Sequence, residues 1–137
     1  MSTLDETRIA TLVDRFYDKV RADTSIGPIF NAAVHDWPEH KALLTRFWCS
    51  VALGAQSYRG NPMAVHRGQP AILAVHFVRW LELWRETTRE VLDEDDAAQM
   101  QDYADRIGRS LRMGMGLPER LDVRPLGIPV VGVGRPR

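Results

Sequence analysis

The sequence lacks the features that place a protein in several large classes. Its single cysteine, Cys49, excludes an internal disulfide. No apolar run approaches the roughly 18 residues that a membrane-spanning helix needs. The 18 basic residues are balanced by 18 acidic ones, which gives no electrostatic reason to expect nucleic acid or an anionic membrane. We therefore expect no nucleic-acid partner and no membrane partner.

Common catalytic and targeting motifs are missing as well. The sequence has no glycine-rich phosphate loop with its lysine, no cysteine and histidine pattern of a zinc site, and no HExxH pair. Its few serines lie in no nucleophile elbow. The first residues, MSTLDETRIA, lack the basic stretch and apolar run of a signal peptide. Together with the lone cysteine, this predicts a cytoplasmic protein.

The sequence is rich in helical periodicity. Four segments repeat apolar residues at intervals of three and four, which is the pattern of a helix with one buried face. The first helix should end near Asp23, because Gly27–Pro28 enforce a turn, and the apolar pair Ile29–Phe30 should then tuck inward. The second should run from Trp37–Pro38 to Gly54, with proline at the first helical position.

The third and fourth periodic segments complete the helical body. The third should begin near Ala71 and bury a face that includes Leu73. The fourth should follow Asp93, which is a suitable N-cap, and fade at Gly114–Gly116. No strand-like run interrupts these segments, so the sequence predicts an all-α fold.

The composition changes after Leu117. Residues 118–137 have no helical period and contain much proline and glycine. We predict a domain over residues 1–117, followed by an irregular tail that is mobile or lies on the surface. A strand over Ile128–Val133 would need a partner strand.

Polar side chains interrupt the otherwise apolar helix stripes. Tyr17, His40, His76 and Trp80 each occupy such a position. Taken singly, a tyrosine or tryptophan there is usually a packing residue, and a histidine is usually half-exposed at the surface. Their occurrence on three different helices is what indicates a shared site.

One further histidine lies between the second and third helices, in the stretch GNPMAVHRGQP. His66 is flanked by Gly60 and Pro62 on one side and by Gly68 and Pro70 on the other. A loop histidine without a ligand role is the ordinary interpretation. A single imidazole cannot complete a closed zinc site. It can bind a metal that brings its other ligands with it, and haem is that case.

At this point the chain resembles a known family, the group III truncated haemoglobins of bacteria. The resemblance covers about residues 8–113 and rests on FYDKVRADTSIGPIFN at 16–31, WPEHKALLTRFW at 37–48, YRGNPMAVH at 58–66 and HFVRWLELW at 76–84. It implies a shortened globin fold, in which a two-on-two sandwich of helices encloses haem b, iron protoporphyrin IX.

The resemblance also implies a set of site residues. His66 matches the proximal iron ligand, Tyr17 and Trp80 match distal donors, and His40 matches a distal histidine that gates entry. The matching apolar pocket positions are Phe30, Leu44 and Phe47. Two questions stay open. His40 or His35 could occupy the sixth coordination position, and the partners of the haem propionates are unassigned among Lys41, Arg46 and Arg67.

The expected function follows from the two distal donors. They would hold O₂ and related diatomic ligands tightly, which favours redox chemistry over bulk transport. We expect either reaction of bound O₂ with nitric oxide to give nitrate, with electrons from an unidentified reductase, or peroxide reduction. Alternatives are a non-enzymatic store or gas sensor, and a helical domain without cofactor. The sequence does not predict an oligomeric state.

Overall fold

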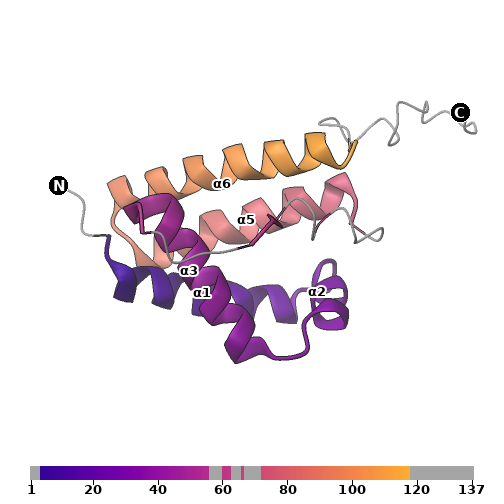
Figure 1. Cartoon of the computed structure of the whole chain (residues 1–137), viewed down its shortest axis with the longest axis horizontal. Coiled ribbons are helices and arrows are strands. Elements are labelled where there is room, and N and C mark those ends of the chain that lie inside the picture. The colour runs from indigo at the N-terminus through magenta and orange to yellow at the C-terminus, as the bar shows by residue number, and fades with distance from the viewer. Residues whose placement is uncertain (1–3, 56–59, 63–65, 67–71, 118–137) are drawn as a thin grey trace, which may run out of the picture.

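The computed structural model describes residues 4–55, 60–62, 66 and 72–117, and every regular element within these ranges is an α-helix (Figure 1). The all-α prediction is confirmed. None of the helices described combines the length and apolar character needed to cross a bilayer. The helices are α1 (Glu6–Ala22), α2 (Gly27–Ala33), α3 (Trp37–Leu53), α5 (Ala74–Val91) and α6 (Glu94–Gly114).

Aspartate side chains cap the N-termini of three of these helices. Asp5 accepts a hydrogen bond from the Arg8 amide of α1 at 2.8 Å. Asp36 begins α3 and Asp93 begins α6 in the same way, accepting from the backbone three residues later at 3.0 and 2.8 Å. Each carboxylate satisfies an amide that the first turn leaves unpaired and also lies favourably at the positive end of the helix. The predicted N-cap at Asp93 is confirmed.

Most predicted helix ends are confirmed. α1 ends at Ala22 with Asp23 as its C-cap, and α3 ends at Leu53, before Gly54. Gly54 has a φ of +73°, the left-handed conformation in which glycine avoids the steric cost of a side chain. The predicted start of the third helix was too early, because α5 begins at Ala74. Leu73, expected on the buried face, precedes the helix and is exposed.

The segment expected to be only a turn contains a short helix. Gly27–Pro28 do follow a turn, but they also begin α2, with proline in the first helical turn. Proline has no amide to lose there and its fixed φ suits a helix start, so the same residue that ends one pattern begins another. Ile29 and Phe30 are half-buried, as the inward-tucking prediction requires.

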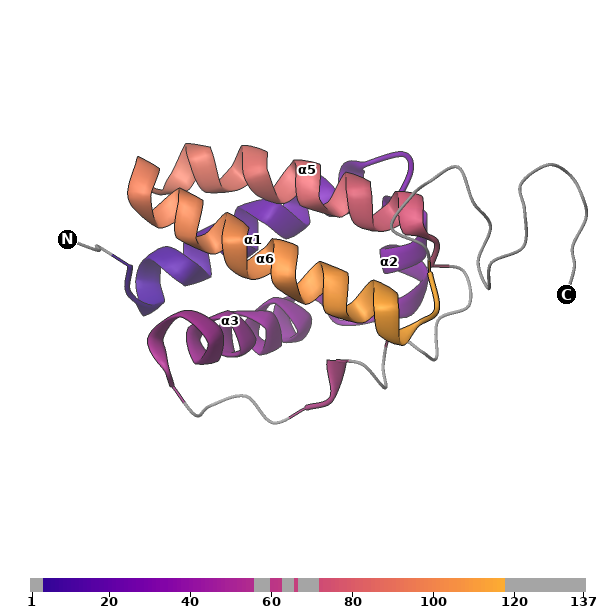
Figure 2. The same cartoon turned by 90° about the horizontal axis from the view of Figure 1, so that it is seen from above.

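The helices form two pairs. α5 and α6 lie side by side in both views and pack along each other, with only Leu92 and Asp93 between them, so they are antiparallel (Figures 1 and 2). α1 packs against α3 and also contacts α2 and α5. α3 makes a further contact with α6. Residues 118–137 lie outside the described residues, so the tail and its possible strand stay predictions.

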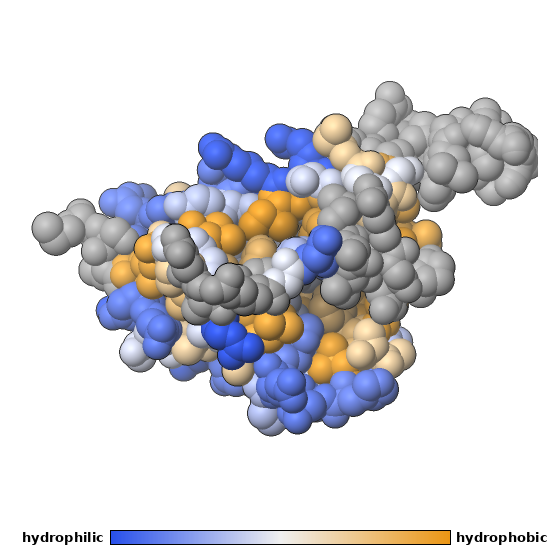
Figure 3. All heavy atoms as spheres, viewed as in Figure 1, coloured by the Kyte–Doolittle hydropathy of each residue, from blue (hydrophilic) through white to orange (hydrophobic). Residues whose placement is uncertain are grey.

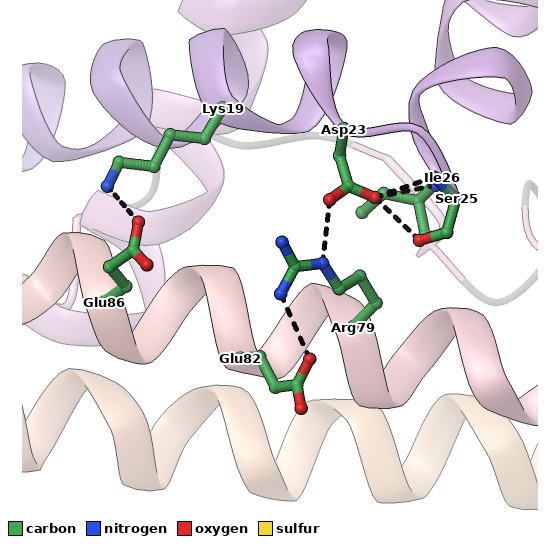
Figure 4. Close-up of polar contacts among 7 residues, drawn as sticks. All are labelled: Lys19, Asp23, Ser25, Ile26, Arg79, Glu82 and Glu86. Carbon is green, nitrogen blue, oxygen red and sulfur yellow. Dashed lines mark hydrogen bonds and ion pairs between the residues drawn. The ribbon is translucent and has the colours of Figure 1, made fainter.

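A buried carboxylate fixes the corner between α1 and α2 (Figure 4). Asp23 accepts hydrogen bonds from the Ser25 amide at 3.0 Å, the Ser25 hydroxyl at 2.7 Å and the Ile26 amide at 3.1 Å. Its other oxygen accepts from Nε of Arg79 on α5 at 2.8 Å. Burial acts to raise the pKa of Asp23, but the hydrogen bonds from Ser25, Arg79 and the backbone outweigh it and hold the pKa well below its usual range.

Asp23→Asn is expected to lower the free energy of unfolding at pH 7 by about 1–3 kcal/mol, because it removes the charge from a buried, hydrogen-bonded group. The depressed pKa in the folded state means that this stabilisation is present above the carboxyl's unfolded pKa of about 4 and is lost as the pH falls toward the folded value. Urea unfolding of both proteins at pH 7 and pH 3 measures the difference. Asp14→Asn is the control, since Asp14 lies in an exposed pair with Lys41. An equal loss of unfolding free energy in both variants would contradict the stabilising role of Asp23 at the corner between α1 and α2.

Gly27 brings α2 close to the end of α1. A Cβ at this position would lie 2.9 Å from the carbonyl oxygen of Arg21 and 3.1 Å from that of Val20. Gly27→Ala is therefore expected to destabilise the protein by about 1–3 kcal/mol through forced backbone movement. Gly108→Ala is the matched control. Its Cβ would meet only side-chain atoms of Leu81 and Phe77, at 3.9 Å or more, inside a helix where alanine is favoured by about 1 kcal/mol. The midpoint of thermal unfolding should fall in Gly27→Ala and rise in Gly108→Ala.

Candidate functional site

The residues singled out from the sequence line one apolar cavity. It lies among α1, α2, α3, α5 and α6 and the segment around His66. Apolar side chains reach the surface across the middle of the face seen in Figure 3, between hydrophilic rims. The structure brings all seven predicted site residues to this cavity: Tyr17, Phe30, His40, Leu44, Phe47, His66 and Trp80.

The cavity is also lined by residues for which the sequence analysis predicted no role in the site. They share apolar side chains without a reactive group, so only their helical spacing could have indicated them. Leu43, Ile107 and Leu111 do lie on the predicted stripes, whereas α2 was not predicted as a helix. The remaining members of this set are Ile29, Ala33, Val34, Trp48, Pro62 and Ile72.

Tyr17 is the buried polar group of the cavity. It lies on the inner face of α1 with only 3% of its surface exposed. Its ring contacts Phe30 of α2 and, edge-on, His40 of α3, with centroid separations of 5.9 and 5.6 Å. Burial raises the pKa of Tyr17 well above its usual range, and a hydrogen bond with Trp80 acts in the opposite direction. The phenol therefore keeps its proton at neutral pH and is a hydrogen-bond donor.

Trp80 is the partner of that phenol. An indole nitrogen can only donate, so in this hydrogen bond Nε1–H of Trp80 donates and the Tyr17 oxygen accepts. The phenol's own hydrogen is left to reach another acceptor. Because a group that accepts a hydrogen bond becomes a stronger donor, the pair acts as a unit.

His40 lies between the cavity and the outside. The imidazole is half-buried and makes an edge contact with Trp37, at 5.4 Å between centroids. The guanidinium of Arg21 covers Trp37 at 4.8 Å from its ring centroid. Burial lowers the pKa of His40, so the imidazole is neutral at neutral pH.

His66 has a defined orientation. Its Nδ1 lies 2.6 Å from the carbonyl oxygen of Pro62. A carbonyl only accepts, so Nδ1 carries the hydrogen and Nε2 keeps a lone pair. The ring is half-buried, and its centroid lies 6.3 Å from that of Phe77. This orientation agrees with the expectation that a backbone carbonyl fixes the tautomer of a metal-binding histidine.

The remaining candidates lie at the edge of the site or away from it. Lys41 binds Asp14 at 2.9 Å and Asp18 at 2.7 Å, and although burial acts to lower the pKa of its ammonium, these carboxylates raise it. Because Lys41 is already paired with these two carboxylates of α1, it is a poor candidate for binding a haem propionate. His35 is exposed and is not among the residues that line the cavity, which leaves His40 as the better placed of the two histidines. Arg46 is exposed, and Arg67 lies outside the described residues.

The donor set limits what metal the site can hold. Within the ranges described above, no three histidine, cysteine or carboxylate side chains come together as metal ligands. A metal bound at His66 would have to bring its other ligands. The few polar atoms on an apolar wall are typical of a cofactor pocket rather than of a metal-ion cage.

Comparisons with known proteins agree with this geometry. Residues 4–110 match the model of the family described as bacterial-like globin. A protein of Campylobacter jejuni named group 3 truncated hemoglobin is 38% identical over 97 residues, which is 68% of this chain and 76% of that protein. The crystal structure of a group III truncated haemoglobin from Campylobacter jejuni superposes with a TM-score of 0.79 at 34% identity, covering 84% of this chain and 94% of that one. The chain therefore belongs to the group III truncated haemoglobins of the bacterial-like globin family, which are haem globins that bind diatomic ligands.

Proposed function

We propose that the cavity holds haem b, whose iron Nε2 of His66 would bind, and that the protein carries out redox chemistry on a bound diatomic ligand or peroxide. The observation that carries this proposal is that residues from five helices converge with His66 on one apolar cavity. The candidate reactions are that of O₂ with nitric oxide to give nitrate, and peroxide reduction. An unidentified reductase would supply electrons.

The side chains present fit haem. The walls are mostly apolar and so suit the faces of a porphyrin. His66 offers Nε2 as the metal ligand, because its other nitrogen donates to the carbonyl oxygen of Pro62. When bound, haem supplies an iron centre that binds diatomic molecules and exchanges electrons. The neutral carbonyl acceptor leaves the imidazole a moderate electron donor, since a carboxylate would increase its basicity more.

Tyr17 is the residue that would hold the ligand. Its O–H, free to turn because Trp80 donates to its oxygen, can donate to a negatively charged ligand atom. Such a hydrogen bond contributes about 1.5–3 kcal/mol, or about one to two powers of ten in the dissociation rate. A protein that releases its ligand this slowly is a poor carrier, which favours a catalyst.

Turnover experiments test the redox part of the proposal. The haem-loaded chain, oxygenated and supplied with a ferredoxin or flavodoxin reductase, is mixed with nitric oxide in a stopped-flow instrument, and nitrate is counted per haem. A second assay follows oxidation of ascorbate by hydrogen peroxide. Sustained turnover above that of free haem, reduced in Tyr17→Phe, is expected in one of the two assays. Tight ligand binding without turnover in either would leave storage or sensing as the function.

His40 is expected to control ligand entry. Because burial lowers the pKa of His40 below the ordinary value for histidine, the imidazole becomes charged only as the pH falls below that value. An apolar cavity disfavours this charge, so the ring should then turn toward solvent. Tyr17 stays protonated over this range, and Arg21 stays charged. Carbon monoxide rebinding after flash photolysis should therefore accelerate as the pH falls, and His40→Leu should remove this dependence. The exposed His35→Leu is the control, and a pH dependence that survives in His40→Leu would contradict the assignment.

A further inference from the structure

Three of the four tryptophans stack face to face. Trp80, in the cavity wall, lies nearly parallel to Trp84, with 6.0 Å between ring centroids and 7° between planes. Trp84 stacks on Trp48 at 4.5 Å and 23°. Phe16 holds this tryptophan column (Trp80, Trp84 and Trp48) from the side, edge-on to Trp80 at 5.7 Å and to Trp84 at 4.9 Å. Trp48 and Trp84 are 1% and 0% exposed, so these two rings are shielded from the surrounding water.

Among the residues that the structure describes, no base accepts a hydrogen bond from the indole nitrogens of the column. Nε1–H of Trp84 donates to the carbonyl oxygen of Met100 at 3.0 Å, and that of Trp80 donates to the Tyr17 phenol. Nε1 of Trp48 is buried without a hydrogen-bond partner in the part of the chain described. Neither a carbonyl nor a neutral phenol takes a proton readily. An indole of this column that lost an electron would keep its proton, so the loss would be easily reversed.

We propose that the tryptophan column is an electron source for peroxide reduction at the cavity, an inference that rests on the proposed function. Reduction of a hydroperoxide, ROOH + 2 H⁺ + 2 e⁻ → ROH + H₂O, takes two protons from solvent and breaks the O–O bond. In the haem-loaded protein, the haem would supply one of these electrons and the column the other. The column would be left as a tryptophan radical cation. A one-electron reductant such as ascorbate would return one electron to the column and one to the haem.

The stacked pair Trp48 and Trp84 is where the positive charge settles. Two overlapping π systems share a charge that one ring alone would carry, which lowers the free energy of oxidising the pair. The column meets the cavity at both ends, because Trp80 and Trp48 both line it. Trp80 also lies parallel to Trp84, the central ring. Tyr17 is the less suitable donor, since a phenol gives up an electron readily only when its proton also leaves. The neutral imidazole of His40 lies near, at 5.6 Å between centroids, but no hydrogen bond from the phenol to it is seen among the described residues.

Trp37 provides an internal control. It is the fourth tryptophan and lies as close to Tyr17 as a relay would need, at 5.9 Å between centroids. The guanidinium of Arg21, however, lies 4.8 Å from its ring centroid. A fixed positive charge so near opposes the formation of a second one. The same residue type near the same cavity should therefore not be oxidised.

Freeze-quench electron paramagnetic resonance of the haem-loaded full chain, mixed with hydrogen peroxide, tests the inference. A tryptophan radical is expected in the natural protein and in Trp37→Phe, and its loss is expected in Trp48→Phe and Trp84→Phe. Trp48→Phe is the decisive variant, because it removes a donor that has no hydrogen bond to lose. Peptide mass spectrometry should find added oxygen on the column and not on Trp37. Near-ultraviolet circular dichroism and the haem absorption band report that each variant is folded and loaded.

The outcomes separate this inference from the proposed function. A haem-loaded protein that shows no tryptophan radical, a tyrosine radical in its place, or an undiminished signal in Trp48→Phe overturns the inference and leaves the haem site intact. A chain that takes up no haem overturns the proposed function, and the inference falls with it.

Discussion

A His66→Gly variant is expected to bind haem at least about a hundredfold more weakly than the natural protein. Removing a residue that only hydrogen-bonds to a metal ligand already commonly lowers metal affinity 10–100-fold. The imidazole would be the protein group that holds the iron, and its Nε2 is oriented for that bond by the Nδ1–H hydrogen bond to Pro62. Titration of the haem-free protein with haemin, followed at the Soret band, measures the change. Free imidazole added to the variant should restore the band, because it can fill the space that the side chain leaves.

The control for this variant is His76, the other histidine near His66. Both line a small second cavity behind the first. Nδ1 of His76 accepts a hydrogen bond from the Leu73 amide at 2.8 Å and so caps the start of α5. His76→Ala should therefore cost about 1 kcal/mol of stability and leave the Soret band unchanged. If His76→Ala lost the band while His66→Gly kept it, the axial ligand would be His76.

Tyr17→Phe is expected to raise the O₂ dissociation rate by about tenfold to a hundredfold, the equivalent of one hydrogen bond of about 1.5–3 kcal/mol to a charged atom. The substitution removes the hydroxyl and leaves the ring to keep its contacts with Phe30 and His40. Stopped-flow displacement of O₂ by carbon monoxide gives the rate. An unchanged rate would show that the phenol does not reach the ligand.

The pairing of Trp80 with Tyr17 makes a further test possible. If the indole acts by donating to the phenol, Trp80→Phe weakens the phenol's hydrogen bond, and the double variant should be little worse than Tyr17→Phe alone. If the indole turns away from the phenol and donates to the ligand directly, the two effects on the free energy of ligand binding should add. The double-mutant cycle distinguishes these two arrangements.

Much of the fold could be predicted because its helices follow local rules. Each of these rules depends only on residues close together in the sequence. Examples are the apolar spacing of three and four, the N-cap at Asp93 and the left-handed conformation of Gly54. α2 was missed for the opposite reason. Its length of seven residues is too short to show a period, and it is held by Asp23 and by Arg79, which lies far along the chain. The start of α5 was misplaced because Leu73 continues the apolar spacing without being buried.

The site residues were predictable by type but not by partner. A tyrosine and a tryptophan on apolar stripes could be recognised, and both line the cavity. Nothing in their spacing indicates that one donates to the other, since that depends on how α5 crosses α1. The pairing of Lys41 with Asp14 and Asp18 is equally non-local, so a propionate partner could not be excluded from the sequence. The tryptophan column depends on Trp48 of α3 meeting Trp84 of α5 in the core, and no sequence period encodes that contact.

The unequal support of the cavity walls has a consequence for how the molecule opens. α1, which carries Tyr17, packs on three other helices, whereas α2, which carries Phe30, packs only on α1 among the helices described. Amide hydrogens of α1 should exchange with deuterated water only when the whole fold comes apart, and those of α2 through local unfolding of far lower free energy. Local unfolding of α2 would let small gases enter while the Tyr17 phenol stays in place. The carboxylate of Asp23, at the corner between α1 and α2, would oppose that motion.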